Sequence, residues 1–189
     1  VVEVARKNIQ LFATGKGSRT NPGHPSINIF DAGEGQTPSE FPNTFLSLGK
    51  NNKQNIFFVQ GRFNMGGSGI LRFCEDHMQL IISKRNPRIL QNFPSKDPKS
   101  AEWGFTLTRF HFEKGNKNPT LLYLAPNGAN NNPKKGEVLS FKSENLKLKA
   151  NLNKSYNDSV SHGTLMKFYE FKSPRKSNIL LQGELQDLI

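Results

Sequence analysis

Cysteine is almost absent from this chain. Cys74 is the single cysteine among 189 residues, which excludes an internal disulfide. Such usage suits a reducing cytosol, and the apolar residues before Cys74 indicate a buried structural thiol rather than a nucleophile. No apolar run approaches the ~20 residues of a membrane span, and no secretory signal opens the chain. Because the four histidines, His24, His77, His111 and His162, show no metal-ligand spacing, the sequence predicts a cytoplasmic protein with neither a membrane span nor a metal site.

The two commonest nucleotide-binding motifs are also missing. A P-loop reads G-x-x-x-x-G-K-[ST], and the nearest segment, residues 15–18 (GKGS), lacks the upstream glycine. A dinucleotide fingerprint reads G-x-G-x-x-G, and the G-x-G pairs at 33–35 and 67–69 are followed by QTP and ILR. The sequence therefore excludes both of these nucleotide folds.

Two glycine clusters nevertheless stand in a suggestive order. The strand-like run 27–30 (INIF) leads into Asp31-Ala32-Gly33-Glu34-Gly35, and about thirty residues later the segment 61–69 (GRFNMGGSG) precedes an apolar run. Glycine lets backbone amides approach phosphate oxygens closely, and a helix N-terminus favours anions. A plain turn and an ordinary glycine-rich loop are the alternative for each motif alone. Their order and spacing favour a nucleotide site.

A third motif, residues 161–169 (SHGTLMKFY), completes a set that resembles the GHKL (Bergerat-fold) ATPases, the superfamily of gyrase B, MutL, MORC proteins and sensor histidine kinases. The resemblance covers roughly residues 9–171. It implies an ATP-binding domain of a larger ATPase, with ATP and Mg²⁺ as ligands. Residues 1–189 are then expected to form one such domain, truncated at both ends.

The resemblance also implies roles for individual residues. Asp31 would accept a hydrogen bond from the adenine amino group, with Thr164 beside it, and Gly33 and Gly35 would leave room beneath the base. The lid over the phosphates would contain Asn64, Gly66, Gly67 and Gly69. Two further residues, Lys50 and Lys53, either face the phosphates or belong to a solvated basic loop.

Hydrolysis requires a further element of the family, a helix with E-x-x-x-N that supplies the catalytic Glu and the Mg²⁺-holding Asn. The nearest candidates, Glu3 and Asn8, are five residues apart, a spacing that does not place them on one helical face. The helix is therefore expected before Val1. No catalytic or metal-binding residue is assigned within the chain, and this fragment alone is expected to be inactive.

The sequence leaves open the function, the behaviour of the lid and the meaning of the charge. The chain could be a degenerate, noncatalytic interaction module with the same fold, whereas a histidine kinase core is disfavoured because no phosphoacceptor helix is present. The lid could be mobile and ordered by nucleotide, with ATP-dependent homodimerisation as in the family, or it could be a static loop. The net charge of +11 could attract nucleic acid or reflect a lysine-rich composition alone.

The periodicity of apolar residues predicts an α/β (α+β) fold, a two-layer sandwich with a mixed, mostly antiparallel sheet and helices on one face. Helices are expected at 38–47, 67–76 and after Gln182. Strands are expected at 8–13, 26–30, 78–84, 105–112, 120–125, 137–142 and 164–171.

Overall fold

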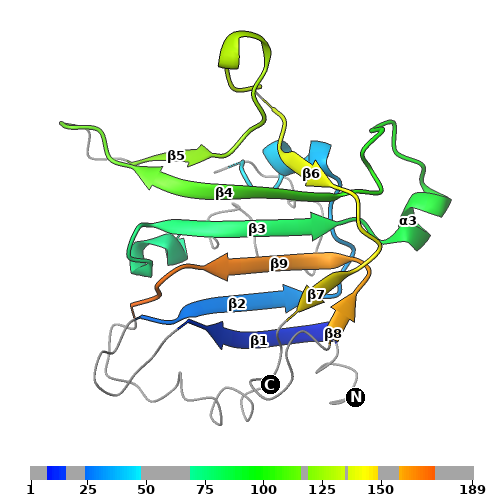
Figure 1. Cartoon of the computed structure of the whole chain (residues 1–189), viewed down its shortest axis with the longest axis horizontal. Helices are drawn as coiled ribbons and strands as arrows, with labels where there is room; N and C mark the ends of the chain where they lie inside the picture. Colours follow the sequence, from blue (N-terminus) through cyan, green and yellow to red (C-terminus); the bar gives the residue numbers. More distant parts are fainter. Residues whose placement is uncertain are drawn as a thin grey trace, which may run out of the picture.

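A computed structural model describes residues 8–15, 24–47, 69–115, 119–134, 136–148 and 158–172. Within these ranges the chain is mixed α/β, with a seven-stranded sheet and a few short helices (Figure 1). The sheet order is β1-β2-β9-β3-β4-β5, β6 also pairs with β4, and every pair is antiparallel. The strands are β1 (Ile9–Thr14), β2 (Ser26–Asp31), β3 (Met78–Lys84), β4 (Trp103–His111), β5 (Thr120–Tyr123), β6 (Leu139–Phe141) and β9 (Gly163–Phe168).

All seven predicted strands are present, with boundaries shifted by a few residues. A separate two-stranded ribbon of β7 (Leu146–Leu148) and β8 (Asp158–Val160) was not predicted. Both strands of the ribbon have three residues, which is too few for an alternating pattern to emerge, whereas the equally short β6 lies within the longer apolar-patterned segment 137–142 that was predicted. The sequence therefore located the main sheet and missed the ribbon.

The helices differ more from expectation. The predicted helix 38–47 is a 3₁₀ helix, η1 (Pro38–Asn43), followed by turns, because Pro42 within it lacks the N–H that a longer α-helix would use. In place of the predicted helix 67–76, the described residues contain only the 3₁₀ helix η2 (Ile70–Phe73). It ends because Cys74 is extended and forms a bridge with Phe171. The predicted helix after Gln182 lies outside the described residues.

Two other short helices were not predicted, α3 (Pro87–Asn92) and the 3₁₀ turn η3 (Ala129–Asn131). The side chain of Asn86 caps α3 by accepting from the N–H of Arg88 at 3.0 Å, and Pro87 occupies its first turn. This capping signal is present in the sequence, but no helix was predicted there. None of the described helices has the length and apolar content required to cross a membrane.

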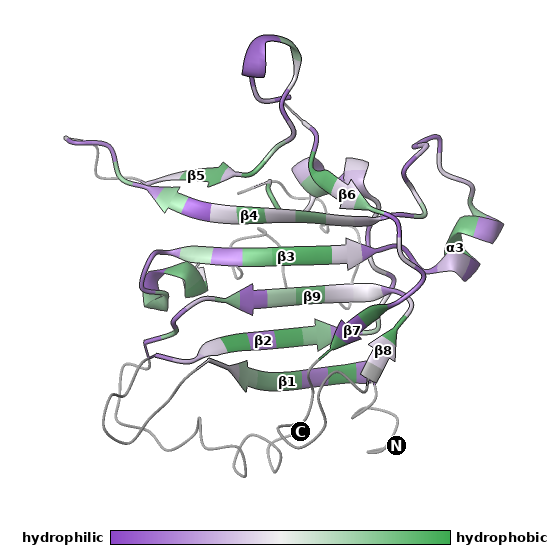
Figure 2. Cartoon of the chain, in the orientation of Figure 1, coloured by the Kyte–Doolittle hydropathy of each residue, from purple (hydrophilic) through white to green (hydrophobic). Residues whose placement is uncertain are grey.

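Both apolar clusters of the described core contain residues on one face of the sheet. One cluster joins Ile27 of β2 and Phe168 of β9 to Leu71 of η2, and the other joins Ile81 of β3 to Phe41 of η1. The register places the side chains of these three strand residues on the same face. Figure 2 shows apolar residues concentrated along the central strands. Cys74 belongs to the first cluster and is buried, and burial raises the pKa of its thiol to about 11, which agrees with a structural role.

The opposite face carries a buried tryptophan beneath a lysine. Trp103 is fully buried, and the Nζ atom of Lys84 lies 5.7 Å from the centre of its ring. The same Nζ donates to the carbonyl oxygen of Ser143 at 2.8 Å, so Lys84 ties the connection between β6 and β7 to the sheet. Desolvation lowers the pKa of Lys84, and the charge of Glu144 offsets part of this change.

Candidate functional site

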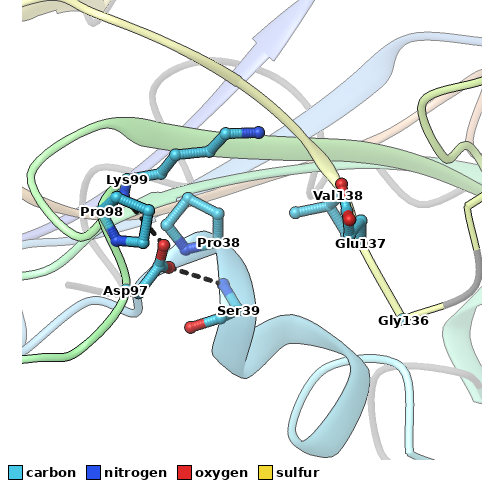
Figure 3. Close-up of a pocket in the computed structure, with 8 residues that line it drawn as sticks. All are labelled: Pro38, Ser39, Asp97, Pro98, Lys99, Gly136, Glu137 and Val138. Atoms are coloured by element: carbon cyan, nitrogen blue, oxygen red, sulfur yellow. Dashed lines mark hydrogen bonds between the residues drawn. The ribbon is translucent and has the colours of Figure 1, made fainter.

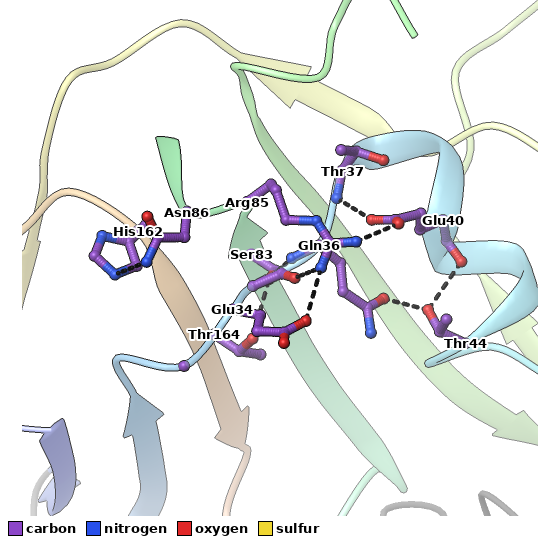
Figure 4. Close-up of polar contacts among 12 residues, drawn as sticks. Glu34, Gln36, Thr37, Glu40, Thr44, Ser83, Arg85, Asn86, His162 and Thr164 are labelled. Carbon is purple, nitrogen blue, oxygen red and sulfur yellow. Dashed lines mark hydrogen bonds and ion pairs between the residues drawn. The ribbon is translucent and has the colours of Figure 1, made fainter. Parts of the chain in front are cut away.

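A row of polar residues crosses three neighbouring strands at one end of the sheet. Asp31 is the last residue of β2 and lies directly opposite Thr164 of β9, which in turn lies opposite Ser83 of β3. Because paired residues in an antiparallel sheet share a face, these side chains point to the same side, the side that also carries the two apolar clusters. Figure 4 shows Ser83 and Thr164 side by side at this end of the sheet. Asp31 and Thr164, predicted to be neighbours, are brought together across 133 positions of sequence.

The Asp31 carboxylate folds back over the turn that follows it. Its Oδ1 atom accepts a hydrogen bond from the backbone N–H of Gly33 at 3.1 Å. A Cβ atom at position 33 would lie only 2.6 Å from Oδ1, so a larger residue there would make the carboxylate shift. Desolvation raises the pKa of Asp31, and the hydrogen bond from Gly33 partly lowers it again. The first glycine of D-x-G-x-G thus positions the carboxylate.

Gly35 packs against the end of β3, and its role beneath a base stays a prediction. Its φ of +62° suits glycine, and a Cβ atom there would lie 1.8 Å from the carbonyl oxygen of Lys84. The N–H of Asn86 also donates to the carbonyl oxygen of Glu34 at 2.7 Å. Gly35 therefore allows the D-x-G-x-G loop to pack against the end of β3.

Thr164 belongs to a buried hydrogen-bond network. Its Oγ1 lies 3.0 Å from the Oγ of Ser83, which also donates to the carbonyl oxygen of Gly163 at 3.0 Å. The backbone N–H of Gln36 donates to the same Ser83 oxygen at 2.9 Å. Ser83 is fully buried, and it connects β9 to the D-x-G-x-G loop. Sequence reasoning missed Ser83 because it is a single small polar residue near the end of β3 and belongs to no motif.

Gly163 holds the other side of this junction. Its φ is +117°, and a Cβ atom there would lie 2.2 Å from the carbonyl oxygen of Asp31. The glycine of the G-T motif is therefore required for β9 to approach the end of β2 closely. This gives the pairing of Asp31 with Thr164 a steric basis.

Arg85 is a second residue that sequence reasoning missed. Its Nη1 donates to the carbonyl oxygen of Gly35 at 2.8 Å and lies 3.4 Å from the carboxylate of Glu34. Its Nη2 donates to Glu40 of η1 at 2.6 Å, and the other Glu40 oxygen accepts from the N–H of Thr37 at 2.7 Å. Arg85 thereby clamps the loop to η1 (Figure 4). The only signal for Arg85 in the sequence was its position immediately after a predicted strand.

His162 stands at the edge of the same region. Its Nε2 lies 3.1 Å from the Nδ2 of Asn86 and its Nδ1 lies 3.0 Å from the Oγ of Ser161. The pKa of His162 is lowered, chiefly by desolvation and also by the charges of Arg88 and Lys84. A neutral ring suits this arrangement, because Nε2 then accepts from the amide of Asn86.

Gly69 is the one predicted lid residue within the described residues, and it is not adjacent to Asp31. It begins η2 with helical backbone angles, and no atom lies within 4 Å of the place that a Cβ would take. η2 packs near Ile27, four residues from Asp31 along β2, which is about 13 Å at the usual strand rise. The other predicted residues, Lys50, Lys53, Asn64, Gly66 and Gly67, lie outside the described residues.

A cavity of about 250 Å³ lies elsewhere, between η1, the turn at 97–99 and the segment 136–138 (Figure 3). The carboxylate of Asp97 at its wall accepts from the backbone N–H groups of Ser39 at 3.2 Å and Lys99 at 2.8 Å. These bonds fix the turn against η1. None of the predicted site residues that the structure describes lines this cavity.

Among the described residues, no group of three or more His, Cys, Asp or Glu side chains is placed to hold a metal ion, so we assign no ligand to Mg²⁺. Comparisons of the chain with protein-family models, with curated proteins and with solved structures found no match.

Proposed function

We propose that this chain is the ATP-binding domain of a GHKL-type ATPase, with the adenine at the Asp31 end of β2. On this proposal the fold is a Bergerat-like two-layer sandwich whose helical layer covers the face that carries Asp31. The triphosphate would extend along that face toward Gly69. Homodimerisation on ATP binding belongs to the same proposal.

The observation that supports the proposal best is the register of β2 against β9. It sets Asp31 of D-x-G-x-G directly opposite Thr164 of the G-T motif, and a Cβ atom at Gly35 or Gly163 would clash with backbone atoms at this junction. A carboxylate held by its own turn, next to a buried threonine, offers hydrogen-bond acceptors to the amino group of a base. The segment that begins at Gly69 lies farther along the same face, in the direction that the phosphates would take.

Thermal unfolding with and without nucleotide tests the proposal. We expect ADP or ATP with Mg²⁺ to raise the melting temperature, because a ligand at ~100 times its dissociation constant stabilises the folded state by roughly 2.7 kcal/mol. Asp31→Asn should remove most of this increase, because an amide cannot serve the base amino group as a carboxylate does.

Asp97→Asn is the matched control, since Asp97 also accepts a hydrogen bond from the backbone N–H two residues later but lies at the cavity of Figure 3. It should leave the nucleotide-induced increase unchanged. An absence of any shift in the unmodified protein at millimolar nucleotide would refute the proposal.

A further inference from the structure

The hydrogen-bonding capacity of Ser83 is completely used in this structure. A serine hydroxyl has one hydrogen and two lone pairs. The carbonyl oxygen of Gly163, 3.0 Å away, can only accept, so it takes the hydrogen. The N–H of Gln36, 2.9 Å away, can only donate, so it takes one lone pair. One lone pair of Ser83 remains, and the Oγ1 of Thr164 lies 3.0 Å from it.

We infer that Ser83 is a specificity-determining residue, which fixes the hydroxyl of Thr164 as a donor to Ser83 and leaves Thr164 only lone pairs to offer a ligand. The geometry requires this direction because Ser83 has no second hydrogen. Thr164 is largely buried at 7% exposure, so its hydroxyl has few other partners. Ser83 acts through Thr164 and is a positioning residue rather than a contact of the ligand.

The consequence for the ligand rests on the proposed function. Asp31, opposite Thr164 in the register, is also an acceptor when ionised. Two acceptors on adjacent strands suit a group with two N–H donors, which is an exocyclic amino group such as that of adenine. A keto oxygen at the same place, as in hypoxanthine, would face two acceptors and no donor. A site built to pair with a donor rejects an analogue that lacks it.

The affinities of the whole chain for ADP and IDP, measured by calorimetry, test the inference. We expect the unmodified protein to prefer ADP. In Ser83→Ala the Thr164 hydroxyl can rotate and donate to the keto oxygen of IDP. The ratio of the affinity for ADP to that for IDP should therefore fall by about fivefold, which corresponds to one ordinary hydrogen bond. If Ser83 had only a structural role, Ser83→Ala would weaken the binding of both nucleotides equally and leave the ratio of their affinities unchanged. That result would overturn the inference.

A second background makes the test specific to Thr164. In Thr164→Val no hydroxyl is available, so adding Ser83→Ala should no longer change the ratio. A further fall of the ratio in this background would show that Ser83 acts by another route and would also overturn the inference.

A measurement without nucleotide separates this inference from the proposed function. NMR of the nucleotide-free protein should show a slowly exchanging Thr164 hydroxyl proton with through-space contact to Ser83, lost in Ser83→Ala. If that proton is found and no nucleotide binds, the proposed function fails while the direction of the hydrogen bond stands. If nucleotide binds and the Thr164 proton exchanges freely or points away from Ser83, the inference fails alone.

Discussion

At the scale of single residues, the charge of Asp31 in the D-x-G-x-G turn lowers the stability of the folded protein. Asp31 ends its strand with a carboxylate whose pKa is raised by desolvation, so the ionised form is less favourable in the folded protein than in the unfolded chain. The close approach of Gly33 holds the carboxylate there. On the proposed function this cost would be kept because Asp31 binds the base.

We therefore expect Asp31→Asn to stabilise the nucleotide-free protein at neutral pH. Because the folded pKa of Asp31 is raised, the cost of its charge is absent below the ordinary value of 3.8 and grows as the pH rises through the folded pKa, above which it is constant. The gain in unfolding free energy should thus be full at neutral pH and vanish in acid. Denaturant unfolding of both proteins from pH 3 to pH 7.5 measures it, and a variant less stable than the parent at pH 7 would contradict the prediction.

The sequence identified part of this site. Asp31, Gly33 and Thr164 follow from motifs that are local in sequence, and the register brings two of them together. Ser83 and Arg85 could not be predicted in the same way, because their partners lie about fifty or eighty positions away and only the sheet order makes them neighbours. A residue whose role depends on the pairing of distant strands is not marked by any local pattern in the sequence.

At the scale of elements, the contacts of Arg85 join β3, the loop after β2 and η1. Its side chain is mostly buried, and its two outer nitrogens are divided between Gly35 and Glu40. A guanidinium provides this fork, whereas a lysine presents a single point charge.

Arg85→Lys and Arg85→Ala should each lower the unfolding free energy by about 1 to 2 kcal/mol, the usual range for charge-assisted hydrogen bonds that are partly exposed. Hydrogen exchange over residues 32–40 should increase at the same time. The matched control is Lys172→Ala, which breaks the exposed ion pair with Glu75 and should cost at most about 0.5 kcal/mol. Equal effects of the Arg85 and Lys172 variants would count against the clamp.

The elements also show where sequence patterns succeed. Strands of four residues or more, such as β3 and β4, alternate clearly enough to be located. The lengths of two helices were overestimated, because a start signal such as Thr37 followed by Pro38 does not say where a helix ends. Pro42 and the extended Cys74 limit the described parts of 38–47 and 67–76 to one or two 3₁₀ turns.

At the scale of the whole molecule, the positive charge is unevenly distributed along the sequence. The described ranges contain 13 of the 26 Lys and Arg residues and 12 of the 15 Asp and Glu residues. The formal excess there is therefore +1, and the remaining +10 belongs to the other segments of the sequence. Nucleic-acid contact, the alternative that the composition left open, would draw mainly on those segments.

We expect any binding of duplex DNA to follow this division. Neutralising three basic residues outside the described ranges should lower the magnitude of the slope of log affinity against log salt by at least about one, since each phosphate contact contributes about 0.9. Neutralising three within the described ranges should change the slope little. The first set is Lys16, Arg19 and Lys154, and the matched set is Lys96, Lys114 and Lys142. Fluorescence anisotropy at several salt concentrations compares them, and equal slopes for the two sets would contradict the prediction.

The position of β9 governs the order in which the sheet can be assembled during synthesis. β9 is the last of the described strands along the chain, yet it lies between β2 and β3. Until residues 163–168 have left the ribosome, β2 with β1 and β3 with β4 are separate hairpins, each with an open edge that can pair with another chain. Pairings of such long sequence separation also form slowly. Between the synthesis of β4 and that of β9, the nascent chain therefore carries these unprotected edges, which chaperones can cover.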